Sequence, residues 1–192
     1  MGGYFGHAGV YLIQVLFGLY ILAVMLRFLF QLVRADFYNP ISQVIVKVTN
    51  PPLLPLRRLI PGLYGIDLAS VVLLFVLQAL ELYLIIGLQR GFQMGLAGVS
   101  IMAVAQLIEL AVYIMIFAIF IRIIISWINP MSAYNPAMSL LTSLTEPLMR
   151  PARRLIPPIS GLDLSPIAVF VVLQLFIILF VNPLEYFGRS LL

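Results

Sequence analysis

The sequence contains no cysteine and only one histidine, His7, among its 192 residues. Without cysteine the chain has no disulfide, no thiol nucleophile and no Cys-based zinc or iron–sulfur site. A single histidine excludes a bis-histidine haem site inside a membrane. With so few catalytic residue types, we also expect no Ser–His–Asp or Cys–His catalytic set.

Charge is scarce as well. Only 9% of the residues are charged and 63% are hydrophobic, whereas a soluble domain carries about 25% charged residues. The mean hydropathy of +1.13 therefore indicates an integral membrane protein. The net charge of +4 comes from bases that cluster beside apolar segments. The positive-inside rule explains this placement better than nucleic-acid binding, so we expect no nucleic-acid partner.

Other features of enzymes are also missing. The sequence has no Gly-rich phosphate-binding loop and no acidic cluster suited to a metal. The polar loops span about 33 residues each, which is too few for a catalytic domain. We therefore expect a protein that is not an enzyme and that holds no metal or cofactor.

Four stretches are long and apolar enough to cross roughly 30 Å of hydrocarbon, which requires about 20 helical residues. They lie near Val10–Val33, near Leu68–Leu88, within Leu96–Ile128 and near Leu164–Val181. The predicted fold class is an all-α membrane protein with four transmembrane helices.

The chain also contains a tandem repeat with a step of 96 residues, because Asn39–Gln78 aligns without a gap to Asn135–Gln174. Polar, proline, glycine and apolar residues recur at equivalent positions of the two copies. In the first copy they are Asn39, Pro40, Thr49, Pro51, Pro55, Arg57, Arg58, Leu59, Ile60, Pro61, Gly65, Asp67 and Gln78, and in the second they are Asn135, Pro136, Thr145, Pro147, Pro151, Arg153, Arg154, Leu155, Ile156, Pro157, Gly161, Asp163 and Gln174. Identity at polar, proline and glycine positions indicates two copies of one unit. We assign a first repeat to residues 1–95 and a second to residues 96–192. Each would hold two spans, so the repeats would be parallel helical hairpins.

Loop charge predicts the orientation. Seven basic residues lie in the two long loops, and two lie on the opposite side: Arg34, Lys47, Arg57, Arg58, Arg150, Arg153 and Arg154 against Arg90 and Arg189. The positive-inside rule then places the long loops in the cytoplasm and both termini outside a bacterial inner membrane.

Each long loop has its own pattern. Ile41–Val48 and Ala137–Leu144 follow Asn-Pro and contain no helix breaker, so we predict two short amphipathic helices on the membrane surface. The prolines that follow predict an extended segment. Asp67 and Asp163 stand where the next spans begin, which predicts that they are N-caps.

The doubled pattern NP-x8-T-x-P-x3-P-x-RR-LIP-x3-G-x-D, flanked by apolar spans, resembles the YggT family of bacterial membrane proteins, also called YlmG. The resemblance covers nearly the whole chain. A second motif runs from Arg122 through Ser126 and Trp127 to Pro130, and the first repeat departs from it: Arg27 stands one position out of register and no Trp follows. The resemblance implies a role in osmotic-stress tolerance or ion homeostasis. Relatives of the family are also associated with division or with assembly of membrane complexes.

The paired arginines Arg57–Arg58 and Arg153–Arg154 are the first candidate site. If the four guanidinium groups meet around the pseudo-twofold axis, they would bind anionic lipid or an acidic protein partner. The alternative is a topology anchor whose arginines pair partly with Asp67 and Asp163.

Ionisable and amide side chains inside the spans form the second candidate site. Glu81 and Glu109 lie in apolar sequence and match Ile177 and Ile13 at the repeat offset, so they break the symmetry. Together with the symmetric Gln78 and Gln174 they could line a path for a cation or proton. The alternative is neutral packing, with one carboxyl protonated, or exposure at the membrane interface.

Two functions follow from these sites. The first is a non-enzymatic inner-membrane protein that supports osmotic-stress tolerance or ion homeostasis, as a conduit or as a modulator of a transporter. The second is a scaffold or assembly factor that binds other membrane proteins through its Arg–Pro loops. Homo-oligomerisation fits either function. The asymmetric acids favour the first, and the duplicated loops favour the second.

Overall fold

The computed structural model describes residues 4–63, 65–128, 135–156 and 163–192. These residues form helices and no strand. In chain order the elements are α1 (Tyr4–Leu32), α2 (Pro40–Leu59), α3 (Leu68–Arg90), α4 (Leu96–Ile128), α5 (Pro136–Leu155), α6 (Ser165–Phe176), the π-helical segment η2 (Ile177–Val181) and α7 (Asn182–Ser190).

Four helices are long and apolar enough to cross a membrane, as the sequence predicts: Gly6–Leu32, Leu68–Arg90, Leu96–Ser126 and Ser165–Ser190. The last is longer than predicted, because α6, η2 and α7 form one continuous helix. Its π-helical segment ends at Val181, two residues before Pro183. A proline has no N–H for the carbonyl four residues earlier, and a π-helical turn accommodates that missing bond.

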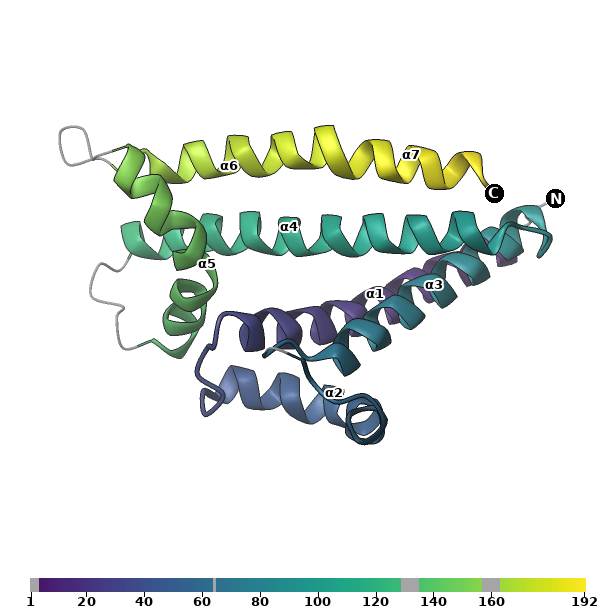
Figure 1. Cartoon of the computed structure of the whole chain (residues 1–192), viewed down its shortest axis with the longest axis horizontal. Helices are drawn as coiled ribbons and strands as arrows, with labels where there is room; N and C mark the ends of the chain where they lie inside the picture. Colours follow the sequence, from purple (N-terminus) through teal and green to yellow (C-terminus); the bar gives the residue numbers. More distant parts are fainter. Residues whose placement is uncertain (1–3, 64, 129–134, 157–162) are drawn as a thin grey trace.

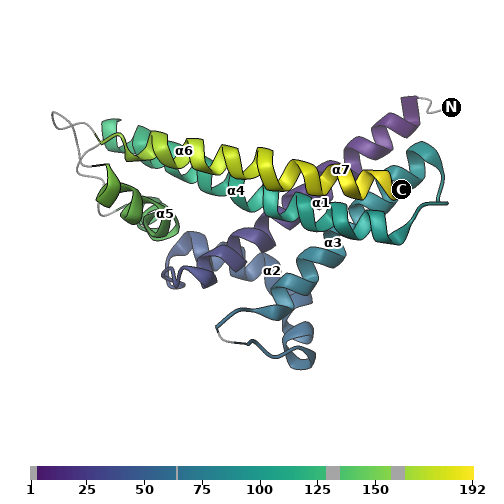
Figure 2. The same cartoon turned by 45° about the horizontal axis from the view of Figure 1, so that its top comes forward.

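The spans run in alternating directions, so both chain termini lie at one end of the molecule and α2 and α5 lie at the other (Figure 1). In the first repeat α1 packs against α3, and in the second α4 packs against α7. Contacts between α3 and α4 join the two halves, and Figure 2 shows α4 beside both α3 and the last span. Because α1 and α4 run in the same direction, this is the parallel arrangement predicted for the repeats.

The helices α2 and α5 begin as predicted but do not end as predicted. Asn39 Oδ1 accepts a bond from the Ile41 N–H at 3.0 Å, and Asn135 Oδ1 accepts one from the Ala137 N–H at 2.9 Å. Both helices then continue for 20 residues, with Pro51, Pro52 and Pro55 inside α2 and Pro147 and Pro151 inside α5. The predicted extended segment is therefore wrong.

Tertiary packing explains why these helices continue past their internal prolines. Both bend part of the way along (Figure 1), as expected where backbone hydrogen bonds are lost. One face of each helix is buried beside the bend, at Thr49 and Leu53 in α2 and at Thr145 and Met149 in α5. Contacts on this face stabilise the helical course that proline alone disfavours.

The main apolar cluster lies at the end of the molecule that carries α2 and α5. Ile21, Val24 and Leu29 of α1 contribute to it, together with Leu53 of α2 and Leu144 of α5. Side chains from both repeats therefore share one core. In a bilayer, such helices associate mainly through close packing and interhelical hydrogen bonds.

The opposite end of the second repeat is held by glycines. A Cβ atom on Gly98 of α4 would lie 2.7 Å from the Gly188 carbonyl oxygen of α7, and a Cβ on Gly188 would lie 3.1 Å from the Gly98 oxygen. The backbones of α4 and α7 therefore approach each other at a distance that only small residues permit.

Candidate functional site

In the first repeat a buried arginine joins α1 to α2. The Arg27 side chain is nearly inaccessible, with 4% of its surface exposed. Its Nη1 donates to Thr49 Oγ1 at 2.7 Å, to Asn50 Oδ1 at 2.8 Å and to the Val46 carbonyl at 3.3 Å. All three acceptors are uncharged, so this guanidinium group binds α2 without a carboxylate.

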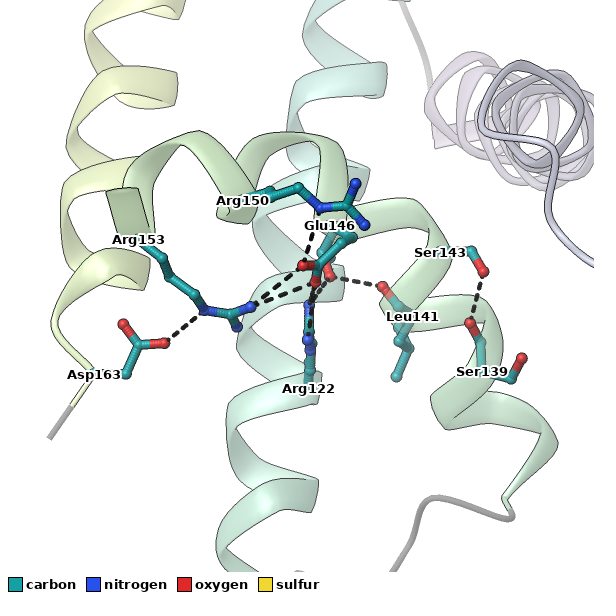
Figure 3. Close-up of polar contacts among 9 residues, drawn as sticks. Arg122, Ser139, Leu141, Ser143, Glu146, Arg150, Arg153 and Asp163 are labelled. Carbon is teal, nitrogen blue, oxygen red and sulfur yellow. Dashed lines mark hydrogen bonds and ion pairs between the residues drawn. The ribbon is translucent and has the colours of Figure 1, made fainter. Parts of the chain in front are cut away.

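In the second repeat an arginine also joins the first span to the helix that follows it, but one of its acceptors is a carboxylate. Arg122 Nη1 donates to Thr145 Oγ1 at 2.8 Å, and both of its terminal nitrogens lie 3.2 Å from Glu146 Oε2. Glu146 also contacts Arg153 at 3.4 Å and Arg150 at 3.7 Å. Figure 3 shows the carboxylate of Glu146 among these three arginines.

The two joints reveal a shift in the repeat. At the 96-residue offset Arg27 aligns with Ile123, whereas Thr49 aligns with Thr145 and Asn50 with Glu146. Arg27 and Arg122 nevertheless donate to the equivalent threonine and to the residue after it. The first spans of the two repeats are therefore shifted by one residue in sequence. The two arginine side chains nevertheless reach equivalent residues.

The first arginine of each predicted pair binds the acid of its own repeat. Arg57 donates to Asp67, which also accepts from the Ser70 hydroxyl, and Arg57 Nη2 reaches Gln31 Oε1 at 3.3 Å. Arg153 Nε lies 3.0 Å from Asp163 Oδ2. The alternative interpretation, a topology anchor, included pairing of these arginines with Asp67 and Asp163. Both repeats contain such a pair.

The four arginines do not meet. Arg58 and Arg154 are exposed, and α2 and α5 approach each other at their N-terminal ends, where Asn39 Nδ2 donates to the Pro136 carbonyl at 2.8 Å. From this contact the two helices diverge (Figure 1), and the arginine pairs lie at their far ends. The prediction of one shared four-arginine site is not supported.

The predicted caps take different roles. Asp67 is the N-cap residue of α3 but makes no capping hydrogen bond to the backbone. Its carboxylate is engaged by Arg57 and Ser70 instead. Asp163 lies one residue before the N-cap of α6, which is Leu164, and its Oδ1 accepts from the Ser165 N–H at 2.9 Å. Asp163 therefore accepts a hydrogen bond from a helix N–H, but it lies one residue before the N-cap position that was predicted for it.

The pKa of both aspartates lies below the ordinary value in these surroundings. Burial acts to raise the pKa of Asp67, but the hydrogen bonds from Arg57 and Ser70 and the positive charge of Arg57 hold it below its ordinary value. Burial also acts to raise the pKa of Asp163. The bonds from Ser165, followed by the bond from Arg153, hold its pKa below the ordinary value.

The intramembrane polar residues form a cluster in the half of the molecule that carries the termini. Glu81 is 8% exposed, and its Oε2 accepts from Gln78 Nε2 at 3.0 Å. Gln78 also donates to Gln106 Oε1 at 3.0 Å, and Gln106 Nε2 lies 3.4 Å from Glu185 Oε1. Glu185 in turn accepts from Arg189 at 2.8 Å.

A cavity of about 430 Å³ adjoins this cluster. Its lining includes Gln14 of α1, Glu81 of α3, Gln106 of α4 and Arg189 of α7. Gln89 and Arg90 also line it, and both are exposed, so the cavity opens toward the end of the molecule that carries the termini. Side chains from both repeats therefore build one polar cavity.

The structure brings only part of the predicted path together. Gln78 and Glu81 belong to the cluster, whereas Gln174 is exposed on α6. Glu109 lies in α4, one helical turn from Gln106, and takes no part in the described hydrogen bonds of the cluster. Among the described residues no group of three His, Cys, Asp or Glu side chains is placed to hold a metal ion.

Sequence reasoning missed Gln106, Glu185 and Glu146. Gln106 had a visible signal, because an amide inside an apolar span requires a partner. Glu185 lay beyond the predicted end of the last span. Glu146 replaces Asn50 in an otherwise similar loop, a difference whose meaning depends on where Arg122 lies.

A family profile described as CCB3/YggT matches residues 7–89 and 101–184, one segment in each half of the chain. The Pseudomonas aeruginosa protein PA0392 is 49% identical over 92% of this chain and 90% of its own length. A Vibrio alginolyticus protein encoded in the proC 3′ region is 42% identical over 85% of this chain and 88% of its own.

YggT of Escherichia coli K12 is 31% identical over 95% of this chain and 94% of its own length. No solved structure matches the chain. The family match covers most of the residues and falls in two segments, as expected for a doubled unit. The chain therefore belongs to the CCB3/YggT family.

Proposed function

We propose that this protein supports osmotic-stress tolerance or ion homeostasis and that the polar cavity around Glu81 is its working site. The observation that supports the proposal is the hydrogen-bonded series Glu81–Gln78–Gln106–Glu185, which joins side chains from three helices. Two of its members, Glu81 and Gln106, line the cavity. Polar groups are costly inside a membrane and usually mark a functional site.

The carboxylate of Glu81, and not the summed charge of a lining that also includes Arg90 and Arg189, favours a cation or a proton. Glu185 is paired with Arg189, whereas Glu81 makes no ion pair within the described residues and is held only by the Gln78 amide. A buried carboxylate without a basic partner gains stability by taking up a positive charge. Carboxylate and amide oxygens are also suitable ligands for hard cations.

The shape of the molecule favours a modulator over an open conduit. Gln14 lines the polar cavity and Arg27 lies at the other end of α1. The step from one residue to the other corresponds to about 20 Å along the helix. Ile21, Val24 and Met25 in this interval are buried in the apolar cluster. These apolar side chains separate the cavity from the opposite end of the molecule along α1.

Ion flux through proteoliposomes that contain only the purified protein tests this form of the proposal. We expect membranes that stay tight to K⁺, Na⁺ and H⁺ gradients, because the apolar layer closes the path. Flux that Glu81→Gln abolishes and Glu109→Gln preserves would instead establish a conduit. Glu109→Gln is the matched control, because it removes an intramembrane acid outside the hydrogen-bonded series.

A scaffold or assembly function is the second candidate, and one duplicated feature favours it. Each surface helix ends in an exposed arginine followed by an exposed leucine, Arg58–Leu59 and Arg154–Leu155, with the leucines 80% and 83% exposed. Such a pair suits contact with a protein partner or with the membrane interface. Because the chain has no cysteine, a crosslinker can be attached at one chosen position. Crosslinking from Arg58→Cys or Arg154→Cys, compared with crosslinking from Gln89→Cys, would reveal a partner specific to these ends.

A further inference from the structure

The first repeat contains a second cavity, of about 540 Å³, between α1 and α2. Three cationic residues line it, Arg27, Lys47 and Arg57, together with the amides of Gln31, Gln43 and Asn50. Among the described residues, no acidic side chain belongs to its lining. The volume lies within the range of about 300–1,000 Å³ that is typical of small-ligand sites.

The positive charge of this pocket is only partly compensated. Arg57 is paired with Asp67. Arg27 has no carboxylate within salt-bridge distance among the described residues, although its side chain is almost fully buried. Its Nε atom is buried without a hydrogen-bond partner in the same part of the chain. Lys47 at the rim is exposed.

The second repeat shows what compensates the equivalent group of basic residues. Glu146 stands in the place of Asn50, and its carboxylate binds Arg122 and Arg153, the counterparts of Arg27 and Arg57. Arg150 supplies a third cation, as Lys47 does in the first repeat. Figure 3 shows this carboxylate held from three sides by guanidinium groups.

We propose that the pocket of the first repeat binds a phosphate-class anion, whose oxygens take the place that the Glu146 carboxylate fills in the second repeat. The charges of the described residues support this assignment. Arg27, Lys47 and Arg57 face one acid, Asp67, whereas Arg122, Arg150 and Arg153 face two, Glu146 and Asp163. The basic residues of the first repeat lack the carboxylate that Glu146 supplies in the second, because Asn50 occupies that position. Asp36, the other acid of the first loop, accepts from the Tyr38 N–H and does not line the pocket.

Guanidinium groups suit this ligand class, because they bind phosphate and carboxylate oxygens through paired N–H donors and stay charged when buried. The pocket lies where the first span meets α2, near the end of an apolar helix that is long enough to cross a membrane. The anion is therefore either the phosphate of an anionic lipid or a free phosphate. The site is at the opposite end of α1 from the Glu81 cavity and does not depend on the function proposed for that cavity.

Two exchanges between the repeats test the proposal in the full-length protein. Asn50→Glu places a carboxylate in the first pocket, as the second repeat has. Glu146→Asn removes the carboxylate from among Arg122, Arg150 and Arg153 and so gives the second repeat the residue that the first repeat has at this position. Equilibrium dialysis of the delipidated protein with labelled inorganic phosphate counts free anions, and native mass spectrometry with phosphatidylglycerol or phosphatidylcholine counts bound lipids.

For the wild type we expect one saturable site, for inorganic phosphate or for phosphatidylglycerol, and none for phosphatidylcholine. Asn50→Glu should weaken binding by roughly tenfold or more, and Glu146→Asn should raise the count to two. Lys47→Gln changes an exposed side chain and should weaken binding while the fold is kept, so the test does not depend on how well the buried variants fold.

Phosphate binding would identify a site for a free anion, and binding of phosphatidylglycerol alone would identify a headgroup site. Absence of saturable binding of both probes would overturn the proposal. Binding that is unchanged in both Asn50→Glu and Lys47→Gln would overturn it too, because the anion would then lie elsewhere.

Discussion

The guanidinium group of Arg27 lies 2.7 Å from the hydroxyl of Thr49 and so joins the first span to a bent surface helix. Thr49 is fully buried, and its own hydroxyl donates to the Ile45 carbonyl one turn earlier at 2.7 Å. Thr145 makes the equivalent bond to Leu141, also at 2.7 Å. In both repeats, one threonine therefore connects the helix backbone to the arginine of the neighbouring span.

Thr49→Val should destabilise the protein by about 1–2 kcal/mol, because the valine removes an acceptor from a buried cation that has no carboxylate partner among the described residues. Thr145→Val is the matched change in the second repeat. Its effect should be smaller, since Arg122 keeps its ion pair with Glu146. Unfolding in mixed micelles with increasing denaturing detergent measures both values. Equal losses in the two repeats would contradict this account of the joint.

The pair Arg57–Asp67 should make stability depend on acid pH. The folded-state pKa of Asp67 lies below its ordinary value, so its stabilising contribution is complete above the unfolded pKa of about 3.9 and is lost as the pH falls through the folded value. The difference in unfolding free energy between the wild type and Asp67→Asn should therefore be constant near neutral pH and shrink in acid.

Asp163→Asn provides the control for that titration. Asp163 is more exposed than Asp67, with side-chain exposures of 40% and 4%, and water screens exposed ion pairs strongly. We expect a smaller difference between the wild type and this variant at neutral pH. A difference for Asp67→Asn that grows in acid would have the wrong sign for the proposed pairing.

Gly98→Ala should separate α4 from α7. The added Cβ would meet the Gly188 carbonyl oxygen at 2.7 Å, and backbone atoms cannot move aside as a flexible side chain can. We expect a loss of about 1–3 kcal/mol. Gly18→Ala in α1 is the control, because no described atom lies within 4 Å of its Cβ, and alanine there should be neutral or stabilising. The same unfolding assay compares the two.

Thiol labelling should report the orientation of the chain. The sequence has no cysteine, so each introduced cysteine is the only target. Gln14→Cys lines the polar cavity and should react with a membrane-impermeant maleimide added from outside the cell. Tyr38→Cys, at a position 88% exposed beside α2, should react only after the membrane is opened. The reverse pattern would place the termini in the cytoplasm.

Much of the fold could be predicted from sequence, because apolar length identifies the spans and polar identities identify the repeat. Asn39 and Asn135 correctly predicted where α2 and α5 start. Their ends could not be predicted, since proline disfavours helix locally and only the burial of Thr49 and Leu53 shows why the helix continues. Predictions of helix ends from local sequence do not include a contact that forms only in the folded molecule.

The sites were predicted less completely for a related reason. The offset of 96 residues matched arginine pairs that bind their own repeats. It also showed Arg27 and Arg122 one residue out of register, but not that both contact the equivalent threonine. Gln78 and Gln174 match perfectly in sequence, yet one is buried and the other is exposed. Symmetry in sequence does not show which face of a span the packed repeats cover.

The most direct test of the account is growth after an osmotic upshift in cells that lack this protein and carry plasmid-borne variants. If function resides in the cavity, the wild type and Glu109→Gln should restore growth, and Glu81→Gln should not, with equal amounts of each protein in the membrane. Full restoration by Glu81→Gln at wild-type abundance would contradict the claim that the Glu81 cavity is the working site.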